Sequence, residues 1–158
     1  MQIWASQVSK MPIFDISLGK YIAWTNGLVF DPQSLRIKLF KVQSRKDQYY
    51  IRVEDISEII AKRILIKSQS EISEADDLIR YQPLIERNLT MIGLPVVDDT
   101  GKKLGVCKDL LLDSWGLDLS AISIRPSLLH RLLYKEQRID ALQIKQVLND
   151  KIIIQTPN

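Results

Sequence analysis

The chain has 158 residues and a formal net charge of +3 at neutral pH, with a sequence pI near 9.0. Its content of 46% hydrophobic and 26% charged residues is typical of a folded protein and excludes a disordered chain. The chain contains no run of about 18 apolar residues, so no transmembrane helix is predicted. The start, MQIWASQVSKMP, lacks the pattern of a signal peptide. The single cysteine excludes an internal disulfide and a multi-cysteine metal site. We therefore expect a cytoplasmic protein.

A phrase near the start of the chain is repeated 82 residues later. Residues 15–31 read DISLGKYIAWTNGLVFD, and residues 98–113 read DDTGKKLGVCKDLLLD. A repeat of this kind predicts one structural unit that is built twice. At the constant offset the matched pairs include Gly19 with Gly101, Trp24 with Val106 and Asp31 with Asp113.

Each copy has the pattern of short strands separated by turns. Gly19 and Gly101 lie where a hairpin turn needs a residue that tolerates positive φ, and we also assign Gly105 to a structural turn. Alternating apolar residues predict a strand after each of the first two glycines. Several short strands of this kind predict a small barrel. The further strands are expected from the apolar triplets at 28–30 and 110–112, and from residues 34–40, 63–67, 118–124 and 150–155.

The segment 70–90 between the copies predicts an ordered helical connector. Ser73 followed by Asp76 is the pattern of a helix N-cap, and Pro83 is expected to end or kink the helix near Gln82. The apolar residues Ala75, Leu78 and Ile79 are spaced for one helix face. The predicted organisation is a first domain at 1–69, the connector at 70–90 and a second domain at 91–158.

The second copy, LPVVDDTGKKLGVCKDLLLD at residues 94–113, resembles the opening of a PRC-barrel domain. RIDALQI followed by DKIIIQ, at 138–144 and 150–155, resembles the closing strands of that family. The first copy departs from the pattern, since Ala23 occupies the position that matches Gly105 of the second copy. The resemblance implies a mostly β protein made of two small PRC-type β-barrels, in tandem, joined by a short helical connector.

The resemblance also implies what such a protein does. PRC barrels include the cytoplasmic part of the photosynthetic reaction-centre H subunit. They also include the C-terminal domain of the small-subunit ribosome maturation factor, where the barrel docks a ribosomal protein. The family therefore implies a prokaryotic, non-catalytic docking or adaptor module that binds a protein partner. The alternative that it leaves open is an RNA- or ribosome-associated maturation factor.

No set of residues in the sequence predicts an active site. His130, the only histidine, lies in SLLHRLLYK without a nucleophile or an orienting carboxylate in a motif around it. Cys107 lies in an alternating strand, so its neighbour Lys108 points to the opposite face and we predict an unreactive thiol. Asp98 and Asp99 precede Thr100-Gly101 and predict a turn rather than a metal site. We expect no enzymatic activity, no cofactor and no metal.

Residues 36–52, RIKLFKVQSRKDQYYIR, hold six cations against one aspartate. Cations interleaved with aromatic residues are typical of a groove for single-stranded nucleic acid. A solvated strand face with a charged hairpin tip that protects a sheet edge is the alternative interpretation. The candidate nucleic-acid residues are Arg36, Lys38, Lys41, Arg45, Lys46, Tyr49 and Tyr50.

Residues 125–138, RPSLLHRLLYKEQR, have leucines at helical spacing with cations near the other face. This pattern predicts an amphipathic helix that covers a barrel mouth or contacts a partner or a membrane surface. Trp115, at a turn, is the candidate anchor for a partner, whereas Trp4 and Trp24 are expected to pack in the core or between barrels. Pairing of exposed strand edges between chains leaves a homo-oligomer open. The candidate partner-binding residues are Trp115, Arg125, Arg131, Lys135 and Arg138.

Overall fold

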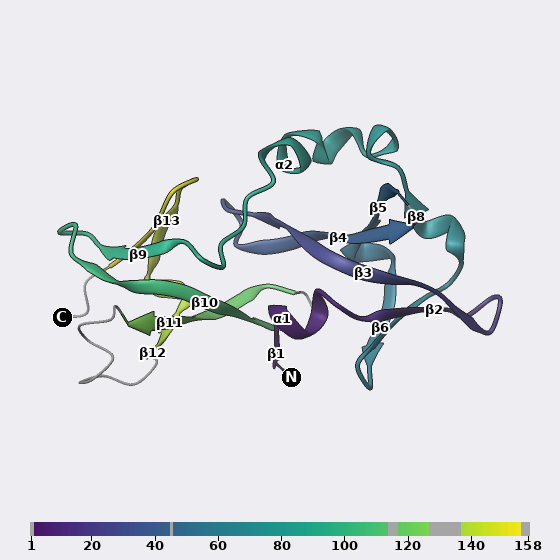
Figure 1. Cartoon of the computed structure of the whole chain (residues 1–158), viewed down its shortest axis with the longest axis horizontal. Helices are drawn as coiled ribbons and strands as arrows, with labels where there is room; N and C mark the ends of the chain where they lie inside the picture. Colours follow the sequence, from purple (N-terminus) through teal and green to yellow (C-terminus); the bar gives the residue numbers. More distant parts are fainter. Residues whose placement is uncertain (1, 45, 114–116, 127–136, 156–158) are drawn as a thin grey trace. The chain divides into compact units, whose positions relative to one another are not determined.

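The structure is a computed structural model that describes residues 2–44, 46–113, 117–126 and 137–155 (Figure 1). The fold is mostly β, and its strands form two sheets. Contacts divide the chain into two compact units. The amino-terminal unit consists of Ser6–Asp31 and Ile37–Asn88. The carboxy-terminal unit consists of Leu89–Asn158 together with two short segments from earlier in the chain, Met1–Ala5 and Pro32–Arg36.

The sheet of the amino-terminal unit has seven strands in the order β6-β7-β2-β3-β4-β5-β8. Strands β2 and β7 pair in parallel, whereas β2 with β3 and β4 with β5 are antiparallel. Ile13, Phe40, Ile51 and Ile64 are fully buried and form the centre of the core. The strands are β2 (Pro12–Asp15), β3 (Lys20–Asp31), β4 (Arg36–Ser44), β5 (Asp47–Arg52), β6 (Ile56–Ile60), β7 (Arg63–Ile66) and β8 (Ile72–Ser73).

The sheet of the carboxy-terminal unit follows the order β12-β11-β10-β9-β14-β13, with β1 added beside β10. Its parallel pair, β9 with β14, corresponds to β2 with β7. The sequence repeat thus corresponds to two sheets of one strand order, and no closed barrel is found among the described residues. The strands are β1 (Gln2–Trp4), β9 (Pro95–Asp98), β10 (Lys103–Asp113), β11 (Leu119–Pro126), β12 (Gln137–Asp140), β13 (Ile144–Val147) and β14 (Ile152–Ile154). Helix α1 (Ala5–Val8) follows β1, and its residues from Ser6 on belong to the amino-terminal unit.

Strands β3 and β10 are each one long strand, so the prediction of a new strand at the apolar triplets is wrong. Register shifts in β10, between Cys107 and Asp109 for example, change the pairing without a turn. Gly19 and Gly101 lie in turns with φ of 66° and 89°, as predicted. Gly105 instead lies inside β10, which corrects its assignment to a turn. A Cβ there would lie 2.3 Å from the backbone oxygen of Arg125, so glycine allows the close approach of β11.

The connector is a series of short helical turns: the 3₁₀ helices η3 (Ala75–Asp77) and η4 (Ile79–Tyr81), and α2 (Gln82–Arg87). The break predicted near Gln82 is present, since η4 ends at Tyr81 and α2 begins at Gln82. Pro83 does not end the helical connector, however, because it lies in the first turn of α2, where a missing N–H costs no hydrogen bond. The N-cap of η3 is Glu74 rather than Ser73. Two successive 3₁₀ turns break the expected 3.6-residue period. Leu78 is therefore buried while Ile79 is 80% exposed.

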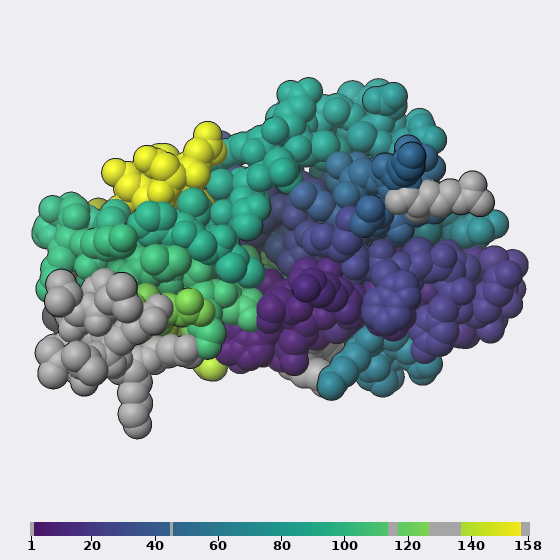
Figure 2. Space-filling model, viewed as in Figure 1, coloured from purple at the N-terminus to yellow at the C-terminus, as the bar shows by residue number. Residues whose placement is uncertain are grey.

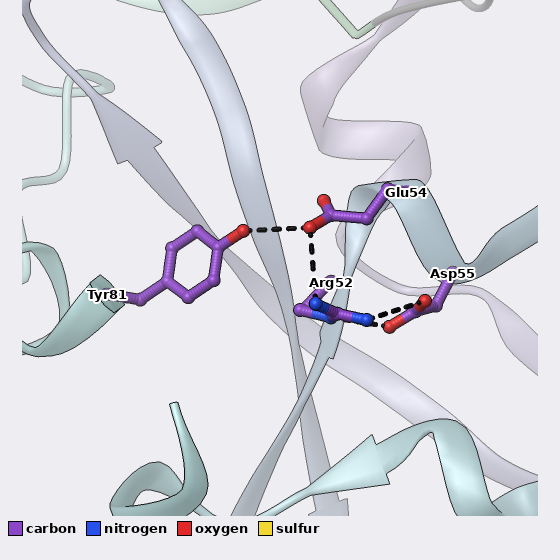
Figure 3. A network of polar contacts seen from close by, with 4 residues as sticks. All are labelled: Arg52, Glu54, Asp55 and Tyr81. Atoms are coloured by element: carbon purple, nitrogen blue, oxygen red, sulfur yellow. Dashed lines mark hydrogen bonds and ion pairs between the residues drawn. The ribbon is translucent and has the colours of Figure 1, made fainter. Parts of the chain in front are cut away.

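The connector packs onto one face of the sheet of the amino-terminal unit, where Figure 1 shows α2 beside β3 and β4. Leu78 joins the sheet residues Val29, Leu39 and Tyr50 in one buried cluster. Two polar links hold the connector there. Lys41 Nζ donates to Asn88 Oδ1 at 2.5 Å, and the Tyr81 hydroxyl donates to Glu54 Oε1 at 2.9 Å (Figure 3). We call this side of β3, β4 and β5 the covered face.

Arg52 fixes the carboxylate that holds the connector. Its Nε and Nη2 donate to Asp55 at 2.7 and 3.0 Å, and its Nη1 lies 3.6 Å from Glu54 (Figure 3). The hydrogen bond and charge of Asp55 raise the pKa of Arg52, so its guanidinium is charged at every pH of interest. The network therefore orients Glu54 toward Tyr81 of the connector.

Candidate docking surface

A second part of the same sheet exposes large apolar side chains. In β2 and β7 the residues Ile13, Ile64 and Ile66 are fully buried. Because side chains alternate along a strand, their neighbours Phe14 and Leu65 point away from the core. Figure 2 shows the residues of β2 and β3, in purple and violet, as part of the visible surface.

The register of the strands brings these outward side chains together. Pro12 pairs with Trp24, and Phe14 pairs with Tyr21. Leu65 lies beside Phe14 across the parallel pair. Ile60 pairs with Arg63 on the other side of β7. Trp24 is 61% exposed, Tyr21 51% and Ile60 45%. We call the set Phe14, Tyr21, Trp24, Ile60, Arg63 and Leu65 the aromatic face.

Arg63 lies at the middle of the aromatic face. Its guanidinium carbon is 6.0 Å from the ring centre of Phe14, and its Nη1 donates to the hydroxyl of Tyr21 at 3.3 Å. The rings of Phe14 and Tyr21 meet edge to face at 5.2 Å between centres. Nε of Arg63 is shielded from water and has no hydrogen-bond partner among the described residues. The guanidinium therefore lies over one ring and donates to the hydroxyl of the other, while its Nε has no acceptor among the described residues.

The carboxy-terminal unit has no such face at the corresponding strands. Val106 pairs with Pro95 there, as Trp24 pairs with Pro12 in the other unit. Lys103 pairs with Val97 where Tyr21 pairs with Phe14. Both valines are half-buried, and Lys103 is exposed. The aromatic face thus belongs to one copy of the repeat. Sequence reasoning matched Trp24 with Val106 but did not show which way either side chain points.

The partner-binding residues predicted from the sequence are placed only in part. Trp115, Arg131 and Lys135 lie outside the described residues, as does His130. Arg125 is exposed in β11. Arg138 is exposed in β12, with its guanidinium carbon 5.4 Å from the ring centre of Trp4.

Two of the related expectations need correction. The helix predicted over 125–138 does not extend to its two ends, because Arg125 and Arg138 are strand residues that lie in β11 and β12. Residues 127–136, between those strands, lie outside the described part of the chain. Trp24 is 61% exposed, so the expectation that it packs in the core of its own unit is wrong. Its neighbour Thr25 is the buried residue, because the strand alternates there.

The cations of residues 36–52 do not share one setting. Arg36 forms an ion pair with Asp118, at 2.5 Å between Nε and Oδ1. Lys41 is held against Asn88, and burial lowers its pKa. Lys38 is half-buried and Lys46 is exposed, whereas Arg45 lies outside the described residues. The alternation of Arg36 and Lys38 with buried residues is confirmed, but a continuous basic groove does not follow from it.

The two tyrosines of the same segment also differ. Tyr50 is 7% exposed in the cluster under the connector, and burial raises its pKa. It is therefore not available to stack on a base, which corrects that part of the nucleic-acid prediction. Tyr49 lines an open pocket of about 300 Å³ together with Asp47, Glu74 and Asp76. Carboxylates beside Tyr49 repel a phosphate backbone.

The residues considered for catalysis have structural surroundings. Burial raises the pKa of Cys107 to about 12, so its thiol is a poor nucleophile at neutral pH. Asp98 Oδ1 accepts from the hydroxyl of Thr100 at 2.6 Å and from the backbone N–H groups of Thr100 and Lys102, both at 2.9 Å. The turn predicted there is confirmed, and these bonds, chiefly that of the Thr100 hydroxyl, lower the pKa of Asp98.

Among the described residues, no group of three His, Cys, Asp or Glu side chains could hold a metal ion. No helix in the same part of the chain is long and apolar enough to cross a membrane. Neither family models nor curated proteins give a match to the chain. The resemblance to a PRC barrel therefore stays a prediction from the residues.

Proposed function

We propose that this protein is a non-catalytic docking module made of two PRC-type units, and that it binds a protein partner through the aromatic face. The observation that carries the proposal is the contiguous exposure of Trp24, Tyr21 and Ile60 around Arg63. Tryptophan, tyrosine and arginine are the residues that most often dominate binding energy at protein interfaces. An exposed apolar patch on a paired sheet is a rigid surface, so a partner need not order it.

The repeated architecture supports the PRC-type part of the proposal. Both units share one order of six strands, and both place one parallel pair next to the turn that contains Gly19 or Gly101. This is the arrangement expected if the sequence segment that resembles a PRC barrel occurs in two copies. Docking is the activity that the resemblance implies, and the aromatic face gives docking a specific location.

The test replaces Trp24 by the residue of the other copy. Trp24→Val keeps a strand-forming residue, so the sheet is expected to stay intact. Tagged full-length protein is used for capture from native lysate, and the retained proteins are quantified. We expect Trp24→Val to lower the retention of specific partners about tenfold, as loss of an interface anchor does. Equal retention by the variant and the parent chain would exclude the aromatic face as the docking site.

Two controls make the result specific. Leu142→Ser removes a side chain that is 91% exposed in the carboxy-terminal unit, so it reports on general stickiness. Trp115→Ala tests the anchor that the sequence predicts. Unchanged circular dichroism and thermal midpoint show that each variant is folded.

The same capture separates the RNA- or ribosome-associated alternative. A lysate treated with nuclease removes partners that are bridged by RNA. Binding through phosphates falls steeply as salt rises, because cations release condensed counterions from the nucleic acid. Partners that survive both treatments and need Trp24 support docking to a protein. Partners that vanish with nuclease and need Lys38 and Lys46 would instead support the alternative.

A further inference from the structure

The charges around the aromatic face are mostly positive. Lys67 directly follows Ile66, the last residue of β7. Lys62 lies in the turn between β6 and β7, next to the pair of Ile60 and Arg63. Both lysines are exposed, and no ion pair joins them or Arg63 to a carboxylate within the described residues. Glu58, which pairs with Leu65, is the one carboxylate on these outward positions.

Arg63 is prepared to bind a carboxylate. Its Nη1 donates to the hydroxyl of Tyr21, and its guanidinium carbon lies over the ring of Phe14. The edge formed by Nε and Nη2 has the geometry that binds both oxygens of a carboxylate at once. Nε has no acceptor among the described residues and is closed off from water, which is an unfavourable state for a donor. A partner carboxylate would supply the missing acceptor after a small shift of the side chain.

We propose that the aromatic face binds a segment of another protein in which an acidic residue stands between apolar ones. The carboxylate pairs with Arg63, and the flanking apolar side chains pack against Trp24 and Tyr21 on one side and Ile60 on the other. This inference rests on the proposed docking function and adds the chemistry of the partner. Lys62 and Lys67 add a positive rim that increases the rate of encounter with an acidic segment.

Two other occupants fit the charges less well. A second copy of this chain, meeting the first face to face about a twofold axis, would place each Arg63 and its lysines near the same cations. Such contact between like charges is unfavourable. An anionic membrane surface is bound by clusters of mobile lysines. The central cation here is instead a guanidinium held against a ring, which suits one defined carboxylate.

The experiment selects the ligand without assuming a sequence. A phage-displayed library of random peptides, each about a dozen residues long as short recognition segments are, is panned on the full-length protein. We expect the enriched peptides to carry Asp or Glu beside apolar or aromatic residues. The best one is then synthesised with a fluorophore, together with a version in which Gln replaces the acidic residue. Anisotropy gives the Kd of each for the parent chain.

Variants show whether the binding uses the proposed contacts. Arg63→Gln, Trp24→Val and the Gln version of the peptide are each expected to weaken binding about tenfold or more. Arg63→Lys keeps the charge but loses the fork, so it should also weaken binding. Arg80→Gln and Leu142→Ser, at exposed positions outside the face, are expected to bind as the parent chain does. The peptide variant needs no change in the protein, so it remains decisive if Arg63→Gln does not fold.

Other outcomes overturn the inference in distinguishable ways. Enriched peptides without acidic residues, or peptides that bind equally to Arg63→Gln and Trp24→Val, overturn the acidic ligand but leave docking elsewhere. Binding only to vesicles that contain phosphatidylserine assigns the face to a membrane. A dimer in sedimentation that Trp24→Val dissociates assigns it to a second copy. If the parent chain retains neither peptides nor lysate proteins, the docking function itself is excluded.

Discussion

The same position of the repeat carries Trp24 in one unit and Val106 in the other. Each pairs with a proline of the preceding strand, Pro12 or Pro95, so the two side chains have equivalent places in their sheets. The tryptophan is 61% exposed, whereas the valine is half-buried. A sheet of this order does not need an aromatic residue there. Its presence in one copy therefore calls for an explanation outside folding, and binding is the one we propose.

The inward positions of the two units show the opposite behaviour. Ile64 in β7 and Ile152 in β14 are both fully buried. Their partners across the parallel pairs, Ile13 in β2 and Val96 in β9, are fully buried as well. Close packing restricts such positions to apolar residues of similar volume. The two copies thus carry similar apolar residues at their inward positions, whereas their outward positions differ. Residues that keep the fold and residues that serve binding can be separated by comparing the copies.

The largest expected effect on stability comes from the covered face of the amino-terminal unit. Leu78→Ala leaves a cavity among Val29, Leu39 and Tyr50, and a change of this kind costs about 2–5 kcal/mol. Trp24→Val, on the aromatic face of the same sheet, is expected to change stability by about 0.5 kcal/mol or less. Urea unfolding of both variants measures the two free energies. If Trp24→Val costs as much as Leu78→Ala, the aromatic face is part of the core and our distinction fails.

Gly105→Ala is expected to come next, with a cost of about 1–3 kcal/mol from overpacking. The added Cβ meets the backbone oxygen of Arg125 at 2.3 Å, and a backbone atom cannot move aside as a side chain does. The other copy has Ala23 at this offset, so that sheet already accepts the methyl group. Ala23→Gly is therefore expected to cost only about 0.5–1 kcal/mol, through backbone entropy. Equal costs in the two units would show that β10 and β11 can separate.

The sequence predicted those parts of the fold that depend on local chemistry. The repeat, the turns at Gly19 and Gly101 and the turn at Asp98 follow from residues that act within a few positions. The long strands were missed because a register shift is set by the partner strand and leaves no mark in the strand itself. Pro83 was misread because proline is accepted at the first turn of a helix as well as after its end.

The candidate surface was less predictable than the fold. Alternation in PIFD, Pro12–Asp15, indicates that Ile13 and Phe14 point to opposite faces, but it does not say which face the connector covers. Tyr50 looked like a stacking residue because its burial depends on Leu78, distant in sequence. Trp24 looked like a core residue because most tryptophans are largely buried. Only the register and the covering element decide these cases.

A smaller effect is expected from the aspartate of each hairpin. Asp15 accepts from the hydroxyl of Ser17 at 2.6 Å and from the N–H of Gln69 at 2.8 Å, and the Ser17 bond does most to lower its pKa below 3.8. A lowered pKa in the folded state stabilises the protein above pH 3.8 and loses this contribution as the pH falls through the folded value. Asp15→Asn should therefore lower the thermal midpoint at neutral pH and reduce the loss of stability as the pH falls below 3.8.

The equivalent aspartate tests whether the two units use this bond alike. The three bonds of Asp98 Oδ1 all lie within its own turn, whereas Asp15 also reaches Gln69, which is 54 residues away. Asp98→Asn should thus also reduce the loss of stability at low pH, but it should lower the thermal midpoint at neutral pH less than Asp15→Asn does. If either variant loses stability at low pH as the parent chain does, the lowered pKa of that aspartate is contradicted.

The smallest expected change is in the chemistry of the inward position next to the compared pair. Cys107 follows Val106 and is 1% exposed, just as Thr25 follows Trp24 and is buried. Burial raises the pKa of the thiol from 9.0 to about 12, which lowers the thiolate fraction at pH 8 about a thousandfold. Maleimide should therefore leave the native chain unmodified at pH 8 and react after unfolding in guanidinium.

Trp24→Cys in a Cys107→Ala background places a thiol on the exposed side and should react at the rate of a free thiol. Rapid modification of native Cys107 would mean that β10 opens readily, and the contrast between a constant inside and a variable outside would then not hold in the carboxy-terminal unit.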